Sequence, residues 1–111
     1  MAKEKEIPEN NGGITPEQIA TWKAKHRKVS EISVVDDGEK HIGYFHRPSM
    51  ETMSAVNKIG KTDEVKAANI LFDNCWLGGS QTMKEEAVVK MAAIGKLNEL
   101  MNINTAEIKN L

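Results

Sequence analysis

Three histidines are the first candidates for chemistry, because imidazole groups bind metals and transfer protons. His41 and His46 are an odd number of positions apart on one predicted strand, so they should lie on opposite faces of it. His26 belongs to a separate predicted helix, and the single cysteine leaves no second sulfur ligand to complete a zinc set. We therefore expect no metal site and no cofactor.

Other polar motifs also lack the partners that catalysis needs. The acidic run at 36–39 is without the alternating oxygen ligands and the closing glutamate of a calcium loop. Cys75 has no base beside it and shares an apolar helix stripe, which favours a buried structural thiol. The Gly78-Gly79-Ser80 segment lacks the lysine and spacing of a phosphate loop. Since no nucleophile–base pair can be named, we expect no enzymatic activity.

A basic run is the best nucleic-acid candidate. It follows Trp22 and comprises Lys23, Lys25, Arg27 and Lys28. Basic residues are also ordinary in the last turn of a helix, where they face the negative end of its dipole. The rest of the chain compensates them, since 15 basic and 16 acidic residues leave a net charge of −1. Binding of DNA or RNA therefore stays an alternative, and the leading expectation is a chain without it.

Length and composition indicate one small domain. The chain has 111 residues and 40% hydrophobic residues, enough for a single core. Its start is charged and polar, unlike a secretory signal, and no apolar run approaches the roughly 18 residues of a membrane span. A lone cysteine excludes an internal disulfide and suits a reducing cytosol. We expect a cytoplasmic protein.

The first elements can be placed from local signals. Residues 1–13 are polar apart from Ile7, so this tail is predicted to be flexible, and 14–111 to form a single α+β domain. Thr15 can cap a helix, with Pro16 in its first position and Gln18 as the capping-box partner.

A β-hairpin is predicted next. If 36–38 is a three-residue loop with Gly38 in the left-handed conformation, Ile32 lies opposite Ile42. This register gathers Ile32, Val34, Ile42 and Tyr44 on one face. A two-residue loop at Asp37-Gly38 would separate Ile32 from Ile42, so we prefer the longer loop.

Three helices should follow. Ser49 can cap the first, Thr62 or Asp63 the second and Thr82 the third, which is predicted to run to about residue 102, with a last turn capped by Thr105. The apolar stripe of the second helix comprises Val65, Ala68, Phe72, Cys75 and Trp76. We expect Trp76 to be substantially buried against the other helices. The predicted fold class is α+β, with an N-terminal helix, one antiparallel β-hairpin and a bundle of about three helices.

The last long helix is apolar on nearly all sides, more than so small a domain can cover. One face should pack on the hairpin and the preceding helix, and the other should meet another chain. We assign the partner-binding role to one set: Val89, Ala93, Leu97, Leu100 and Met101. The Val88–Met91–Gly95 side lies opposite. The alternative is that both faces are covered within the chain.

Two strings of residues resemble small proteins encoded among the tail-morphogenesis genes of tailed phages and prophages. They are Ile42-Gly43-Tyr44-Phe45-His46-Arg47-Pro48 and Ala68-Asn69-Ile70-Leu71-Phe72-Asp73-Asn74-Cys75-Trp76-Leu77-Gly78-Gly79. Some members of this group look like tail assembly chaperones, with a short β element followed by helices. The resemblance covers roughly residues 29–111.

The resemblance implies a function in the cytoplasm of a bacterial host. The chain would act as a non-enzymatic chaperone that binds the tape-measure protein or another tail protein. The apolar pattern of the long helix, not the resemblance, points to the surface used, and self-association into a homo-oligomer is the other use of that surface. The family has no catalytic motif to transfer. The alternatives are a small structural component of the virion and a nucleic-acid-binding regulator.

Overall fold

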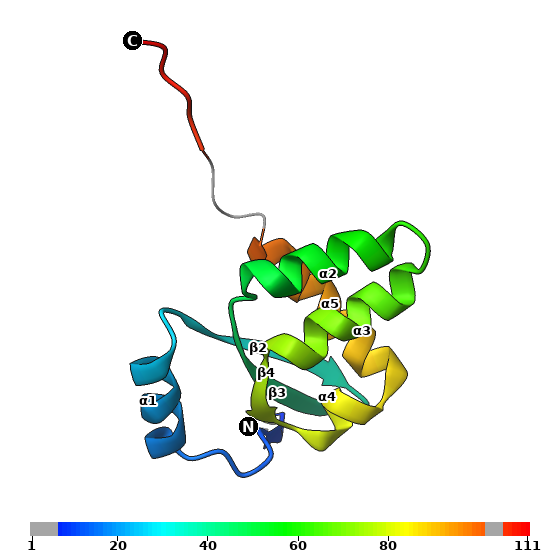
Figure 1. Ribbon diagram of the computed structural model, residues 1–111. Helices are drawn as coiled ribbons and strands as arrows, with labels where there is room; N and C mark the ends of the chain where they lie inside the picture. Colours follow the sequence, from blue (N-terminus) through cyan, green and yellow to red (C-terminus); the bar gives the residue numbers. More distant parts are fainter. Residues whose placement is uncertain (1–6, 102–105) are drawn as a thin grey trace, which may run out of the picture.

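The computed structural model describes residues 7–101 and 106–111, without the side chain of Met101. The fold is a mixture of helix and sheet, as the sequence predicts (Figure 1). The elements in chain order are β1 (Glu9–Asn10), α1 (Pro16–Lys25), β2 (Val29–Asp36), β3 (Glu39–His46), α2 (Met50–Gly60), α3 (Glu64–Cys75), β4 (Trp76–Gly79), α4 (Gln81–Glu85) and α5 (Ala87–Met101).

Within the described residues the sheet has four strands, more than the hairpin that the sequence predicts. β3 is the central strand, antiparallel to β2 on one side. On its other side β3 pairs with β1 in parallel and with β4 in antiparallel orientation. Both added strands are too short to show a periodic pattern, which explains why they are missed in the sequence.

The hairpin register differs from the prediction. Asp36 pairs with Glu39, Ser33 with Ile42 and Ile32 with Gly43. The loop is therefore Asp37-Gly38, with φ of 49° and 75°, and the predicted three-residue loop is wrong although Gly38 does have a positive φ. Two consecutive positive φ values match the twist of the strands that such a turn joins.

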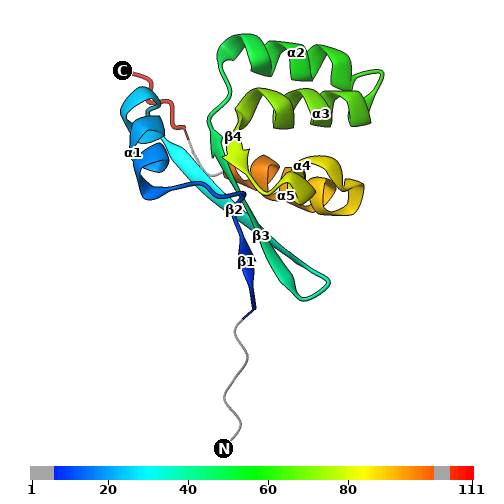
Figure 2. The ribbon, with the colours of Figure 1, turned by 90° about the horizontal axis from the view of Figure 1, so that it is seen from below.

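Separating Ile32 from Ile42 wastes no burial, because both are buried although they lie on opposite faces of the sheet. Ile32 and Phe45 face a core built with α3, α4 and α5. On the opposite face Tyr44 is buried against α1, with 5.8 Å between the ring centroids of Tyr44 and Trp22. Figure 2 shows α1 on one side of the sheet and α2–α5 on the other. The prediction assumed that only one face of the hairpin is buried. Because α1 packs on the other face, this assumption does not hold.

Helix starts follow the sequence closely. Thr15 forms the complete capping box with Gln18, and Ser49 and Asp63 cap α2 and α3 as predicted. The third cap is Ser80, not Thr82. The long helix also breaks: Glu86 has an extended backbone (φ −83°, ψ 116°), which separates α4 from α5. The predicted turn at Thr105 lies outside the described residues.

The packing stripe of α3 is rotated from the predicted one. Its buried residues are Ala67, Leu71, Phe72 and Cys75, and Val65 is exposed. Trp76 is largely buried against the core, in agreement with the prediction, but it begins β4 instead of ending the helix stripe, and it stacks on Phe72 with 5.2 Å between ring centroids. Neighbouring β4 and α5 decide which side of α3 is covered, and helical periodicity alone does not contain that information.

The N-terminal segment also differs from the predicted flexible tail. Pro8 accepts a backbone hydrogen bond from Lys40 at 2.8 Å, and Glu9–Asn10 pair with Lys40 and His41. Main-chain hydrogen bonds need no apolar side chains, so the polar composition of residues 7–13 did not indicate them. None of the helices in the described parts of the chain has the length and apolar character required to cross a membrane.

Candidate functional site

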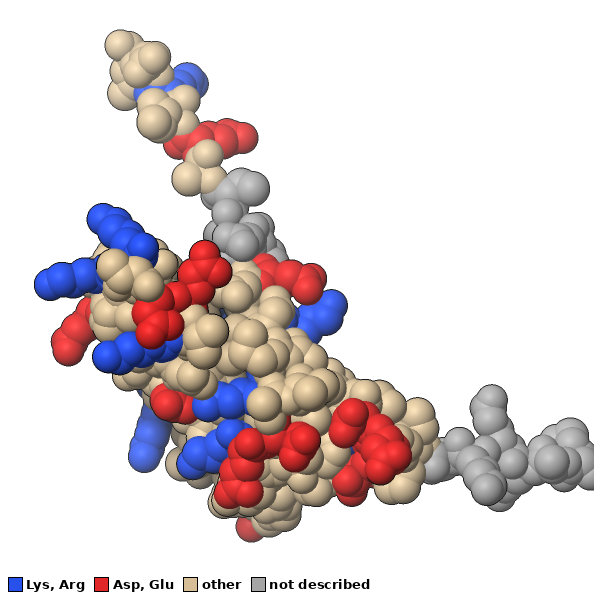
Figure 3. Space-filling model, turned by 90° about the vertical axis from the view of Figure 1, so that its right-hand side faces the viewer, with Lys and Arg blue, Asp and Glu red and all other residues tan. Residues whose placement is uncertain are grey.

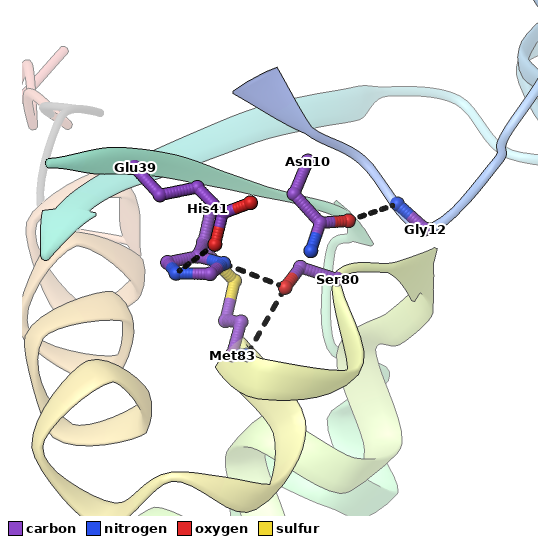
Figure 4. Close-up of polar contacts among 6 residues, drawn as sticks. All are labelled: Asn10, Gly12, Glu39, His41, Ser80 and Met83. Atoms are coloured by element: carbon purple, nitrogen blue, oxygen red, sulfur yellow. Dashed lines mark hydrogen bonds and ion pairs between the residues drawn. The ribbon is translucent and has the colours of Figure 1, made fainter. Parts of the chain in front are cut away.

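A buried polar cluster joins β3 to the start of α4. His41 is 3% exposed and Ser80 has no exposed surface. His41 Nδ1 lies 2.9 Å from Ser80 Oγ, and His41 Nε2 lies 3.3 Å from a carboxylate oxygen of Glu39 (Figure 4). One tautomer satisfies all three groups: the Ser80 hydroxyl donates to Nδ1, and the Nε2–H group donates to Glu39.

The series of hydroxyl, imidazole and carboxylate is the one used in acyl transfer, but its surroundings suit a structural role. Ser80 Oγ accepts from the backbone N–H of Met83 at 3.4 Å, which caps α4. Ser80 N–H also donates to the carbonyl of Ile42 at 2.9 Å. A hydroxyl without exposed surface has no access to a substrate, so the cluster fastens α4 to the sheet. Sequence reasoning missed it, since His41 and Ser80 are 39 positions apart.

Close backbone packing completes this corner. Asn10 Oδ1 accepts from the N–H of Gly12 at 3.0 Å, which shapes the turn after β1 (Figure 4). A Cβ at Gly12 would lie 1.9 Å from the carbonyl oxygen of Gly79. Only a residue without a side chain allows the turn to approach β4 so closely.

The other two histidines form a pair that the sequence did not predict. His26, at the end of α1, stacks on His46, with 4.5 Å between ring centroids and 3° between planes. His46 Nδ1 lies 2.7 Å from the carbonyl oxygen of Arg47. His41 is on the opposite face of β3, as its odd separation from His46 implies. Within the described ranges, no three potential ligands are grouped closely enough to hold a metal ion.

The lone cysteine is buried in the core, where β4 meets α3. Burial raises the pKa of the Cys75 thiol to about 11 from its ordinary 9.0, because the thiolate would lose its hydration. At pH 8 roughly one thiol in a thousand is therefore ionised in the folded protein.

This pKa predicts slow modification of Cys75. The rate of reaction with an aromatic disulfide reagent at pH 8 should be at least about a hundredfold lower in the native protein than in the urea-unfolded chain. Between about pH 9 and 11 the Cys75 thiol stays protonated in the folded protein but ionises in the unfolded chain. The free energy of unfolding should therefore fall as pH rises through this range, and this thiol should leave it unchanged below pH 9. Equal native and unfolded rates would place the thiol at the surface.

The basic candidates are all exposed. Lys23 and Lys25 lie in the last turns of α1, and Arg27 and Lys28 in the connection to β2. In the described part of the structure none of the four forms an ion pair. They are a solvated group at a helix end, the usual location for cations.

The predicted partner-binding face of α5 lies against the protein's own core. Val89 and Ala93 have no exposed surface and Leu97 is 1% exposed, so this assignment is corrected. Leu100 is half-buried against the same core, and the side chain of Met101 lies outside the described residues. Because α5 is apolar on both sides, only the positions of β2 and α3 determine which side is covered.

The opposite side of α5 is open. Val88 is 72% exposed and Met91 51%, and Val65 on neighbouring α3 is 61% exposed. Met91 and Val65 border a groove of about 320 Å³ that is lined by Glu64, Val65, Ala68, Met91, Ile94, Gly95 and Asn98. We call this groove together with Val88 the α5 surface. A hollow of about 350 Å³ beneath α2 shares Glu64, Ala68 and Asn98 with it.

Charged side chains surround this region without covering it. On the side of the molecule where α3 and α5 lie, Figure 3 shows an uncharged band between groups of acidic and basic residues. Within the groove Glu64 is the one charged lining residue. An apolar centre with a polar rim is the usual anatomy of a protein-binding surface.

Comparisons with known proteins leave this surface without a relative to interpret it. No family model, curated protein or solved structure matches this chain.

Proposed function

We propose that this protein is a non-enzymatic assembly protein that binds another protein through the α5 surface. The observation that carries the proposal is the grouping of Val65, Val88 and Met91, each more than half exposed, on two adjacent helices. Contiguous exposed apolar side chains usually mark interaction sites. The groove that Val65 and Met91 line also includes Ile94, which is 3% exposed, so it can receive an apolar side chain from a partner.

The partner that we propose is a tail protein of a tailed phage, with the tape-measure protein first. The likeness of residues 42–48 and 68–79 to tail-morphogenesis proteins supports this choice. Met91 supports a chaperone-like role, because a flexible thioether side chain adapts to varied partner surfaces. The buried hydroxyl of Ser80 supports a role without catalysis.

A charge in the groove should abolish capture of the partner. We expect Met91→Asp to lower the amount of tape-measure protein that co-purifies from a co-expression at least about tenfold, since an uncompensated carboxylate must then be desolvated. Met50→Asp is the matched control, because Met50 is 85% exposed on α2, outside the groove. Both variants should unfold within a few degrees of the wild type.

Two results would contradict the proposal. Equal capture by Met91→Asp and wild type would show that the α5 surface is not the binding site. Mass spectrometry of purified virions separates the two assembly roles: a chaperone should be absent, and a stoichiometric amount would favour a structural virion component instead.

A further inference from the structure

The outer edge of β2 is unpaired within the described part of the chain. β2 contains eight residues and contacts the sheet only through β3, since β1 and β4 both pair with the far side of β3. An edge strand leaves one row of backbone donors and acceptors without sheet partners.

Two hydrogen bonds on the other side of β3 identify the residues of β2 that carry this row. Lys40 N–H donates to the carbonyl of Pro8, and the carbonyl of Ile42 accepts from Ser80 N–H. The backbone groups of Lys40 and Ile42 therefore point away from β2. In an antiparallel ladder, the residue opposite such a position also directs its backbone N–H and carbonyl groups away from the strand it faces.

Val35 lies opposite Lys40, and Ser33 lies opposite Ile42. Glu31, opposite Tyr44, follows by alternation along the strand. In the described part of the chain no strand pairs with this side of β2, so the row is open. These three residues, at alternate positions of β2, present both their N–H and carbonyl groups at this edge.

Several of the usual protections of an edge are missing from β2. The strand contains no proline, and its pairing with β3 runs from Val29 to Asp36 without a bulge. Natural edges that stay unpaired are usually short, interrupted or rich in lysine. Glu31 is the one charge among the three outward-pointing residues.

Space for another strand exists beside the edge. A groove of about 350 Å³ is lined by Ser30, Glu31, Ile32, Ser33, Lys96, Glu99 and Leu100. It extends from β2 to the end of α5, so a strand added at the edge would lie over Leu100. Lys96 and Glu99, which form an ion pair of 3.2 Å, provide one positive and one negative charge in this groove.

We propose that this edge binds a second copy of the chain, β2 against β2 in antiparallel orientation, about a two-fold axis at Ile32. The two four-stranded sheets then form one continuous sheet. Each outward backbone group of Glu31 and Ser33 pairs with the other copy, and Glu31 lies opposite Ser33, so like charges do not face one another. The Lys96–Glu99 pairs of the two copies meet near the axis and are complementary in charge. The interface is separate from the α5 surface and does not rest on the proposed function.

Proline at position 33 tests the pairing. The N–H of Ser33 points away from β3, so Ser33→Pro removes a donor of the dimer without removing a bond of the hairpin. By sedimentation equilibrium we expect the dissociation constant of the dimer to rise at least tenfold in Ser33→Pro. Ser33→Ala, the matched control, keeps the N–H and should dimerise like the wild type. Met91→Asp should also remain dimeric.

Hydrogen exchange provides a readout at single residues. The amides of Glu31 and Ser33 should exchange more slowly as protein concentration rises, while those of Ile32 and Val34 stay protected throughout. If Ser33→Pro fails to fold, Ser33→Glu takes its place and is judged by the same two measurements, because it puts a like charge opposite Glu31 of the other copy. The proposal would be overturned by a wild type that is monomeric up to millimolar concentration. A dimer whose dissociation constant is unchanged in Ser33→Pro and in the fallback variant would also overturn it.

Discussion

Replacing Phe72 by alanine is expected to lower the free energy of unfolding by about 3–5 kcal/mol. Phe72 has no exposed surface and lies at the centre of an aromatic group. Its ring stacks on Trp76 and meets the ring of Phe45 edge to face, with 5.3 Å between the centroids of Phe45 and Phe72. Truncation would leave a cavity that the sheet on one side and α5 on the other prevent from collapsing.

Val65→Ala is the control for this substitution, because Val65 lies on the same helix and is exposed. It should change stability by less than about 0.5 kcal/mol. Urea unfolding followed by far-ultraviolet circular dichroism measures both variants. If Phe72→Ala cost less than about 1 kcal/mol, the aromatic group would not be the centre of the core.

Gly79→Ala is expected to destabilise the protein by about 3 kcal/mol or more, through backbone strain and overpacking together. Gly79 has a φ of 146°, which side chains rarely allow. A Cβ there would lie 2.5 Å from the carbonyl oxygen of Ile42 and 2.7 Å from Gly43 Cα. Both atoms belong to the backbone of β3, so neither can rotate away as a side chain would.

The same substitution at Gly95 should have the opposite sign. Gly95 lies inside α5, and a Cβ there would meet nothing within 4 Å. Gly95→Ala should therefore stabilise the protein by roughly 0.5–1 kcal/mol, since alanine loses less backbone entropy in a helix. Thermal unfolding of the two variants side by side measures the contrast. A tolerated Gly79→Ala would mean that β4 does not approach β3 as closely as described.

Helix starts were readable from the sequence because a cap is a local interaction. The hydroxyl of Thr15 and the side chain of Gln18 are three residues apart, and each satisfies a backbone group of the other. Ser49 and Asp63 act over the same short distance. Ser80 was missed for the opposite reason: its hydroxyl also contacts His41, far away in sequence, which selects it over Thr82 as the cap.

The hairpin shows how far such local reasoning extends. Asp37-Gly38 is a strong signal for a two-residue turn. The predicted register was nevertheless wrong, because only one face of the hairpin was expected to be buried. Trp22 of α1 covers Tyr44 on the second face, so apolar residues are accommodated on both. Register depends on burial, and burial depends on elements distant in the chain.

For the candidate site, the sequence by itself determined that α5 has more apolar surface than one side can bury. Which side remains open was decided only by tertiary structure. β2 and α3 pack over Val89, Ala93 and Leu97, which leaves Val88 and Met91 exposed. Periodicity specifies the faces of a helix through local geometry, whereas the choice between two apolar faces depends on long-range packing, to which all elements contribute at once.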